Sequence, residues 1–215
     1  MKEFLSYFLK TSIFFASLFV LVGCKADIVE VNITAQDLKT ALEGTNVAVP
    51  FKATFSQLGE MNDETRAQLN AIKDITISNM NIDEFNIDSD DQKILISIEG
   101  NLPISKSAET ADPYVILVGK SEILPDFISV QIVNGQKFNS LKAAISGISM
   151  MASPQENQPI KFKVKAPGSR IIAPAAEIDG ITKLLHDVNV KNKLIMSFKD
   201  GPYEKTGGGF FIQIQ

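Results

Sequence analysis

The stretch "DIVEVNITAQDLKTALEG", residues 27–44, carries the clearest signals for local structure in the chain. Apolar residues alternate with polar ones from Val29 to Ile33, which is the period of a half-buried β-strand. Thr34 is a favourable N-cap for a helix over residues 35–43, and Gly44 is typical of a helix stop. We therefore predict that the folded part begins with a strand that leads directly into a short helix.

The order of these elements recurs further along the chain. The first half continues with expected strands at 47–55, 75–79, 93–99 and 114–119, a helix at 63–73 and an acidic loop at 80–92. Five segments of the first half resemble later ones: 37–44 and 140–147, 50–55 and 160–166, 72–79 and 185–192, 93–100 and 193–201, and 114–118 and 210–214.

This recurrence predicts an α+β protein. Two similar strand-helix-strand-helix-multistrand units, residues 28–119 and 128–215, would pack as one mixed α/β body around the linker 120–127. Phe51 would then correspond to Phe162. The alternative is that amphipathic strands rich in Ile, Val, Lys and Ser resemble one another by chance.

The composition excludes several classes of protein. The chain has 215 residues, of which 45% are hydrophobic and 21% charged, as expected for a globular protein with a real core. Its formal net charge is -4, and it has no stripe of Lys and Arg that could neutralise a row of phosphates, so we expect no nucleic-acid partner. The single cysteine allows neither an internal disulfide nor a cysteine metal cluster.

The N-terminal segment has the three-part plan of a secretory signal peptide. Lys2 and Lys10 precede an apolar run at residues 11–22, which is too short for a membrane span of about twenty residues. The run ends in Leu21-Val22-Gly23-Cys24, which resembles the lipobox of bacterial lipoproteins. The alternative is an ordinary signal peptide or an uncleaved anchor.

The lipobox resemblance implies where the protein is located. In that family the sulfur of the cysteine receives a diacylglyceryl group, the signal peptide is removed, and the new amino terminus is acylated, commonly with palmitate. Residues 1–23 would be lost, and residues 24–27 would form a lipid anchor with a short junction. Lys25, where an Asp would favour the inner membrane, implies an outer-membrane lipoprotein of the cell envelope that faces the periplasm, if the organism is Gram-negative.

The sequence contains no recognisable catalytic or metal-binding set. His186 is the only histidine, and we expect it on the surface or as a cap at the end of a helix that contains Ile181, Leu184 and Leu185. The acidic segment from Asp83 to Asp91 lacks the Gly and Glu of a calcium loop, so we interpret it as a solvated hairpin tip. We predict no enzyme activity, no cofactor and no metal.

One segment is a candidate for contact with another molecule. Arg170 lies between two prolines in "KAPGSRIIAPAAE", residues 165–177, which could form a rigid exposed contact loop.

Two functional hypotheses follow from the sequence. The first is a non-catalytic lipoprotein that binds a protein or an envelope component. The second is a carrier or sensor of an apolar ligand such as a lipid. A continuous apolar cavity would favour the carrier, whereas a filled core with an exposed patch would favour partner binding.

Lipidation of Cys24 gives the first testable prediction. Mass spectrometry of the purified protein should show loss of residues 1–23 and the added mass of a diacylglyceryl group. A Cys24→Ala variant should lose membrane partitioning, because buried acyl carbons stabilise the anchor by about 0.8 kcal/mol each. A variant that still partitions normally, at the same mature mass, would contradict the assignment.

Overall fold

The computed structural model describes residues 25–90, 92–199 and 208–215, so the predicted signal peptide and Cys24 lie outside the described residues. In chain order the elements are β1 (Ile28–Thr34), α2 (Ala35–Leu42), β2 (Val47–Leu58), α3 (Asp63–Asn79), β3 (Asn81–Ser89), β4 (Lys93–Ser105), β5 (Tyr114–Lys120), β6 (Ile128–Asn134), α4 (Phe138–Ile148), the 3-10 helix η1 (Met150–Ala152), β7 (Ile160–Lys165), β8 (Arg170–Pro174), β9 (Glu177–Ile178), β10 (Ile181–Thr182), β11 (Leu185–Asn189), β12 (Lys193–Phe198) and β13 (Gly209–Gln213).

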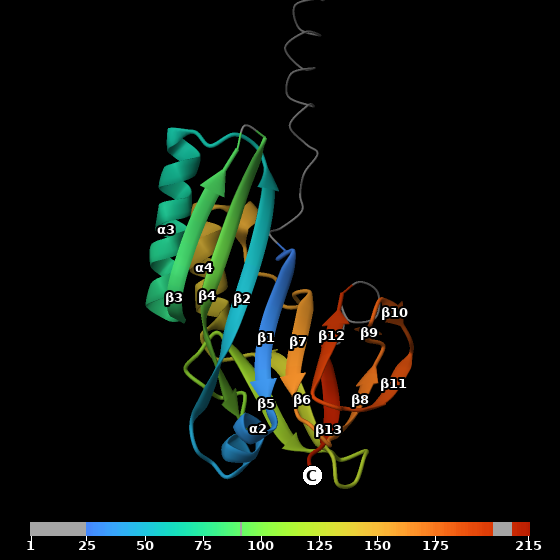
Figure 1. The fold of residues 1–215 in the computed structure, drawn as a ribbon. Coiled ribbons are helices and arrows are strands. Elements are labelled where there is room, and N and C mark those ends of the chain that lie inside the picture. The colour runs from blue at the N-terminus through green and yellow to red at the C-terminus, as the bar shows by residue number, and fades with distance from the viewer. Residues whose placement is uncertain (1–24, 91, 200–207) are drawn as a thin grey trace, which may run out of the picture.

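A single sheet contains the thirteen strands of the described chain (Figure 1). Their order is β10-β9-β12-β7-β1-β2-β4-β5-β6-β13-β8-β11, and β3 pairs with β4 outside this path. Strands make up 48% of the structure and helices 21%, so the protein is mostly β and the α+β prediction is wrong. The prediction failed because segments expected to form a helix or a loop join the sheet as strands.

The strand order also contradicts the prediction of two similar units. β1 pairs with β2, but their expected counterparts β6 and β7 are not neighbours. β6 pairs with β5 and β13, while β7 pairs with β1 and β12. The resemblance between segments therefore reflects the alternation that amphipathic strands share, not a common arrangement in space.

The residues on either side of the proposed linker belong to the same sheet. β5 and β6 are adjacent antiparallel strands, and Lys120 is still part of β5. β1 pairs in parallel with β7 across more than a hundred residues, with Val31 beside Phe162.

Two further local predictions in the first half are wrong. The helix expected to end at residue 73 continues to Asn79 as α3, so residues 75–79 do not form a strand. Most of the expected loop at 80–92 forms β3, because Phe85 and Ile87 alternate with polar residues. A register shift between Ile82 and Glu84 interrupts this alternation and conceals the strand in the sequence.

The prediction of a helix around Ile181 is also wrong. That segment forms the short strand β10 and the start of β11. Just before it, Asp179 and Gly180 have φ values of 51° and 75°, a left-handed backbone that ends one strand and turns the chain into the next.

The first helix begins as the sequence predicted. The hydroxyl of Thr34 accepts a hydrogen bond from the backbone N–H of Asp37, and the Asp37 carboxylate accepts one from the N–H of Thr34. This reciprocal capping box confirms Thr34 as the N-cap of α2. Gly44 follows the helix with a φ of 91°, as expected for a glycine that ends a helix.

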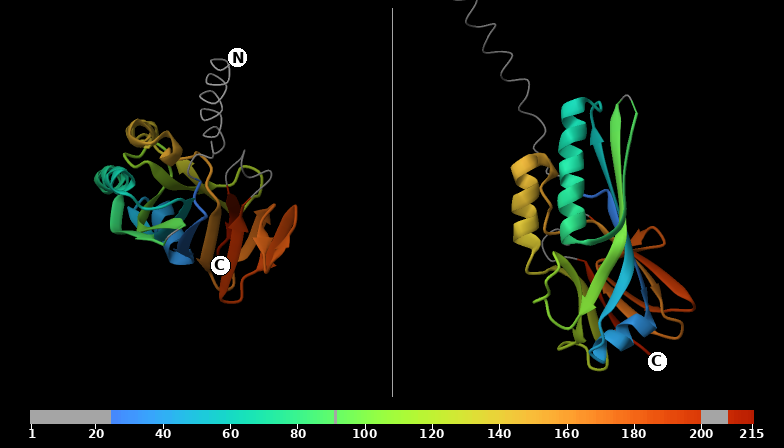
Figure 2. Two further views of the ribbon diagram at one scale, coloured as in Figure 1. Left: turned by 90° about the horizontal axis from the view of Figure 1, so that it is seen from above. Right: turned by 90° about the vertical axis from the view of Figure 1, so that its left-hand side faces the viewer.

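The helices cover one face of the long strands. Figure 2 shows α3 and α4 side by side against β2, β3 and β4. Leu69 and Ile72 of α3 pack with Leu141 and Ile145 of α4 and with Ile94 of β4, and these five side chains form a small buried cluster.

The main core lies on the same face of the sheet, where the strands curl around it. Val31 of β1 is fully buried and stands between Phe51 of β2 and Phe162 of β7. The ring of Phe162 makes edge-to-face contacts with Phe198 and Phe210, at centroid distances of 5.9 and 5.2 Å. This aromatic cluster joins β7, β12 and β13 at the centre of the fold.

Truncation of Phe162 gives the second testable prediction. Because the ring is fully buried, Phe162→Ala should lower the free energy of unfolding by about 3–5 kcal/mol, as measured by urea denaturation. The matched control Ile123→Ala removes a side chain that is 79% exposed and should change stability by about 0.5 kcal/mol or less. A loss below about 1 kcal/mol for Phe162→Ala would place the core elsewhere.

Candidate functional site

An apolar cavity lies between the two long helices and the face of the sheet that they cover. Its volume is about 150 Å³, and it is partly open to solvent. The lining comes from every element around it: Val29, Phe51, Ala53, Phe55, Gln57, Leu69, Ile72, Thr76, Met80, Phe85, Ile96, Ile98, Leu102, Tyr114, Ile132, Leu141, Ile145, Ala152, Pro154, Glu156, Asn157, Gln158 and Ile160.

Strand alternation and helix periodicity together make this lining apolar. On β2 the lining residues Phe51, Ala53 and Phe55 occupy alternate positions, so the polar residues between them face the other side of the sheet. On α3, Leu69, Ile72 and Thr76 follow helical spacing and face the sheet. In this row the small side chain of Ala53 stands between two phenylalanines.

The polar groups of the lining do not make the cavity hydrophilic. The buried hydroxyl of Thr76 donates a hydrogen bond to the carbonyl of Ile72, 2.8 Å away within α3, so its bonding capacity is used by its own helix. Tyr114 packs edge-to-face on Phe138 with ring centroids 5.4 Å apart, and burial raises the pKa of its hydroxyl above the usual range. The phenol therefore stays neutral.

Residues 152–158, here called the rim segment, border the cavity where it reaches the surface. They are half-buried except Glu156, which is exposed, whereas the lining residues Leu69 of α3 and Leu141 of α4 are buried. The rim segment is tied to α4 by a hydrogen bond of 2.9 Å between the hydroxyls of Ser146 and Ser153.

A second contact ties the rim segment to the start of the described chain. The backbone N–H of Ala26 donates a hydrogen bond of 2.7 Å to Oε1 of Gln158, which lines the cavity. Ala26 itself is only 3% exposed, and the N–H of Asp27 bonds to the carbonyl of Thr54. The chain is therefore fixed to the cavity wall from its first described residues.

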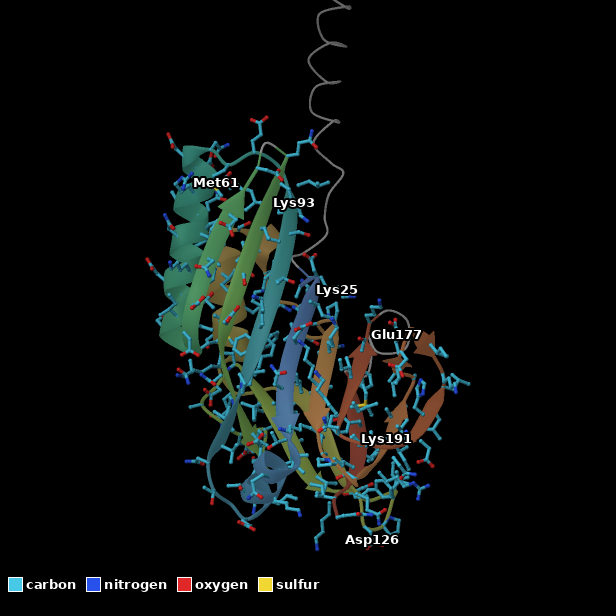
Figure 3. The ribbon with its side chains drawn as sticks, in the orientation of Figure 1. Lys25, Met61, Lys93, Asp126, Glu177 and Lys191 are labelled. Carbon is cyan, nitrogen blue, oxygen red and sulfur yellow. The ribbon has the colours of Figure 1, made fainter. Side chains whose placement is uncertain are left out.

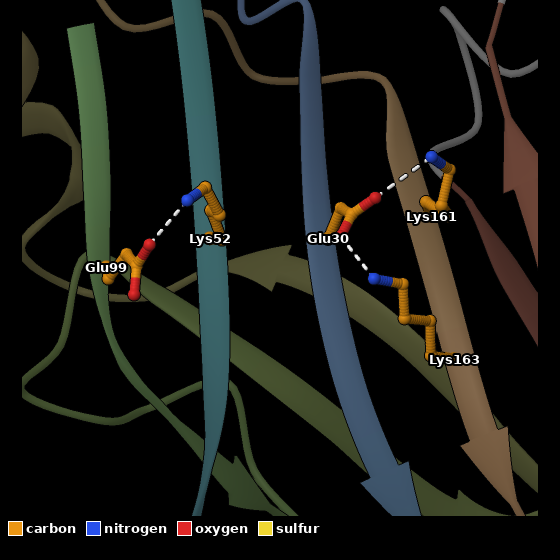
Figure 4. A network of polar contacts seen from close by, with 5 residues as sticks. All are labelled: Glu30, Lys52, Glu99, Lys161 and Lys163. Atoms are coloured by element: carbon orange, nitrogen blue, oxygen red, sulfur yellow. Dashed lines mark hydrogen bonds and ion pairs between the residues drawn. The ribbon is translucent and has the colours of Figure 1, made fainter.

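The opposite face of β1 carries an ion-pair network (Figure 4). Glu30 lies between two lysines of β7 and accepts hydrogen bonds from Lys163 and, at 2.9 Å, from Lys161. Beside it, Lys52 of β2 contacts Glu99 of β4 at 2.5 Å. The ammonium of Lys163, followed by that of Lys161, holds the pKa of the Glu30 carboxyl below its usual value.

Arg170 lies in strand β8 and not in a loop. Its guanidinium makes two hydrogen bonds to the Asp187 carboxylate of β11, at 2.8 and 2.7 Å, and stands 5.8 Å from the ring centre of Phe127. The loop assignment for this residue is thus wrong, and its role in contacting a partner remains a prediction.

His186 lies in strand β11 and is buried, which differs from both the surface position and the helix-capping position that the sequence suggested. Its Nε2 stands 3.0 Å from the carbonyl oxygen of Ala176 and 3.1 Å from that of Ile181. Both neighbours are acceptors, so this nitrogen carries the proton and donates. Because Ile181 belongs to β10, the His186 side chain connects β11 with β10, and these are the strands at the two ends of the sheet order.

The acidic residues of β3 and of the turn that follows it do not converge on one point. Asp83 accepts a hydrogen bond from Asn101, and Asp90 accepts two from the backbone of Gln92 and Lys93 at the end of the hairpin. Within the described ranges, no three His, Cys, Asp or Glu side chains are placed to hold a metal ion.

The sequence contained no signal that separated cavity-lining residues from core residues. Leu141 and Ile145 were recognisable as the apolar face of a helix, but whether such a face is filled or hollow depends on partners distant in the chain. The nearest local hint is Ala53, a small residue at an inward position between Phe51 and Phe55.

Comparison with protein-family models and with curated protein sequences finds no match for this chain. In the part of the chain that the structure describes, no helix is both long and apolar enough to cross a membrane.

The Glu30 network gives the third testable prediction. A carboxyl whose pKa is lowered on folding stabilises the native state at pH values above its unfolded pKa of about 4.3, and this contribution is lost as the pH falls through the folded value. Glu30→Gln should therefore cost about 1 kcal/mol or less at pH 7 and nothing in strong acid, measured by urea unfolding across this pH range.

The matched control is Glu122→Gln, which makes the same charge change at an exposed position in the turn between β5 and β6. A Glu30→Gln penalty that does not decrease as the pH falls would show that the ion pairs contribute nothing.

Proposed function

We propose that this protein is a non-catalytic, membrane-anchored envelope lipoprotein that binds a hydrocarbon chain in its apolar cavity. The observation that carries the proposal is the cavity itself, an unfilled space walled by aliphatic and aromatic side chains. A continuous apolar cavity is the feature that separates a carrier or sensor of an apolar ligand from a module with a filled core. The lipobox at Cys24 supports the envelope location.

The size of the cavity limits what it can hold. Cavities of about 150 Å³ lined by Leu, Ile and Phe stay dry and accept a molecule such as benzene, whereas drug-sized ligands occupy about 300–1,000 Å³. A volume of about 150 Å³ therefore suits part of one hydrocarbon chain, with the remainder of the ligand outside.

The chemistry of the lining supports a binding role without catalysis. Its titratable groups are Tyr114, which burial keeps neutral, and Glu156, which is exposed on the rim segment. General acid–base or nucleophilic catalysis needs two or more groups positioned around the reacting atoms. These two side chains offer no such arrangement.

A series of fatty acids of increasing chain length tests the proposal. Each buried methylene contributes about 0.8 kcal/mol, so affinity should rise about fourfold per added carbon until the cavity is filled, and then level off. Isothermal titration below the micelle concentration, using the mature chain with Cys24→Ser, measures both the slope and the plateau.

Two variants of β2 identify the site. Ala53→Phe places a ring in the cavity and should weaken binding at least about tenfold, since it removes the space for the chain. Ala48→Phe adds the same ring at an exposed position of the same strand and should leave binding unchanged. Affinity that is independent of chain length, or equal in both variants, would contradict the proposal.

A protein or envelope component remains the second candidate ligand. It is favoured by a group of exposed apolar side chains at the end of the sheet, where Ile181, Leu184 and Leu185 are 56%, 87% and 59% exposed. Exposed apolar side chains that lie close together are typical of interaction surfaces. A partner that binds there should be lost with Leu184→Glu and retained with Ala53→Phe.

A further inference from the structure

The described chain begins beside the opening of the apolar cavity. Val29 of β1 lines the cavity, and Cys24 precedes it by only five residues, which extend over at most about 18 Å. The N–H of Ala26 bonds to Gln158 of the rim segment at 2.7 Å, so the chain is fixed to the cavity wall two residues after Cys24. A lipid on Cys24 would therefore hold the rim segment close to the surface of the bilayer.

Exposed apolar side chains lie in the same region. In Figure 3, Lys25 lies in the half of the molecule that carries Met61 and Lys93, and Asp126 lies at the opposite end. Leu58 is 86% exposed and pairs with Lys93 in the register of β2 and β4. Met150 is 79% exposed in η1, which leads into the rim segment.

Such side chains stabilise contact with a lipid surface, because each can enter the apolar part of the interface. Together with the short junction, they favour one orientation of the anchored protein.

We infer that the anchor turns the mouth of the cavity toward the bilayer, and that the occupant is an acyl chain of a phospholipid drawn from that same membrane. This inference rests on the proposed function and adds the source of the ligand and its route. A chain that moves directly from the bilayer to the cavity avoids exposing its methylene groups to water, which is unfavourable. The cavity volume of about 150 Å³ accommodates part of one chain, so the lipid keeps its headgroup at the membrane surface.

The absence of tryptophan from the sequence permits a direct assay. Phe85→Trp puts a single tryptophan fluorophore in the cavity wall on β3. Along the sheet, β3 is three strands from β1 and four strands from β7. The lipidated protein is mixed with phosphatidylcholine vesicles that contain a phospholipid with a nitroxide near the end of one chain. Entry of that chain into the cavity quenches the fluorescence.

Three variants in this background test the orientation. A twenty-residue Gly/Ser insert between Lys25 and Ala26 adds about 25 Å of flexible reach and should slow quenching roughly fivefold, because the mouth is then held less closely to the bilayer. Leu58→Glu combined with Met150→Glu should slow it similarly. The matched control Ile123→Glu, at an exposed position in the turn that contains Asp126, should have no effect.

The outcomes separate this inference from the proposed function. If the tryptophan fluorescence of the insert variant and of the double variant is quenched as fast as that of the lipidated protein without these changes, the proposed orientation is wrong, even if fatty acids bind in solution. If the Cys24→Ser chain takes up the labelled lipid but the lipidated protein does not, the anchor's own acyl chain fills the cavity and the inference is also wrong. Failure of fatty-acid binding by the Cys24→Ser chain would instead overturn the proposed function.

Discussion

Strand β1 has to pair on both sides, and the rest of the structure depends on this double pairing. It joins β2 in an antiparallel arrangement and β7 in a parallel one, and its central residue Val31 is completely buried between Phe51 and Phe162. Because parallel neighbours cannot be joined by a tight turn, this pairing brings together segments that are far apart in the chain. It makes one continuous sheet out of what the sequence suggested were two units.

The two faces of β1 have different roles. Val29 and Val31 point to the inner face, where the first lines the cavity and the second fills the core, whereas Glu30 points outward to Lys161 and Lys163. A shift of the strand by one residue would exchange these faces and expose the apolar set. The cavity wall, the core and the ion-pair network are thus set by the same register, a few residues after the proposed anchor.

The cavity lies between the covering helices and the inner face of the sheet, where β2 and β4 contribute several lining residues. α3 and α4 contribute Leu69, Ile72, Leu141 and Ile145 to a buried cluster, but the inner row of β2 includes the small Ala53. Native interiors are usually packed without such gaps, so a gap of about 150 Å³ lined by apolar atoms is a structural cost that ligand binding can offset. Its opening at the rim segment gives a ligand a way in.

Local signals in the sequence were sufficient for only part of the local structure. The alternation in β1 and the cap at Thr34 were predicted correctly, because both depend on residues within one turn or strand. β3 was missed because its acidic residues and its register shift conceal the inward Phe85 and Ile87. The order of the strands could not be predicted, since the β1–β7 pairing involves no turn and has no local signature. For the same reason the cavity, which both parts of the chain enclose, had no signal of its own.

The central claim is that a hydrocarbon chain occupies the space between the helices and the sheet. Methyl NMR spectra recorded with a fatty acid that carries a nitroxide near its chain end test this claim most directly. The account predicts strong broadening of the methyl signals of four residues that line the cavity, Leu69, Ile72, Leu141 and Ile145. The signals of Ile171 in β8 and Ile212 in β13, which lie in the main core, should be unchanged. Broadening confined to the exposed Leu184 and Leu185, or none at all, would contradict the account.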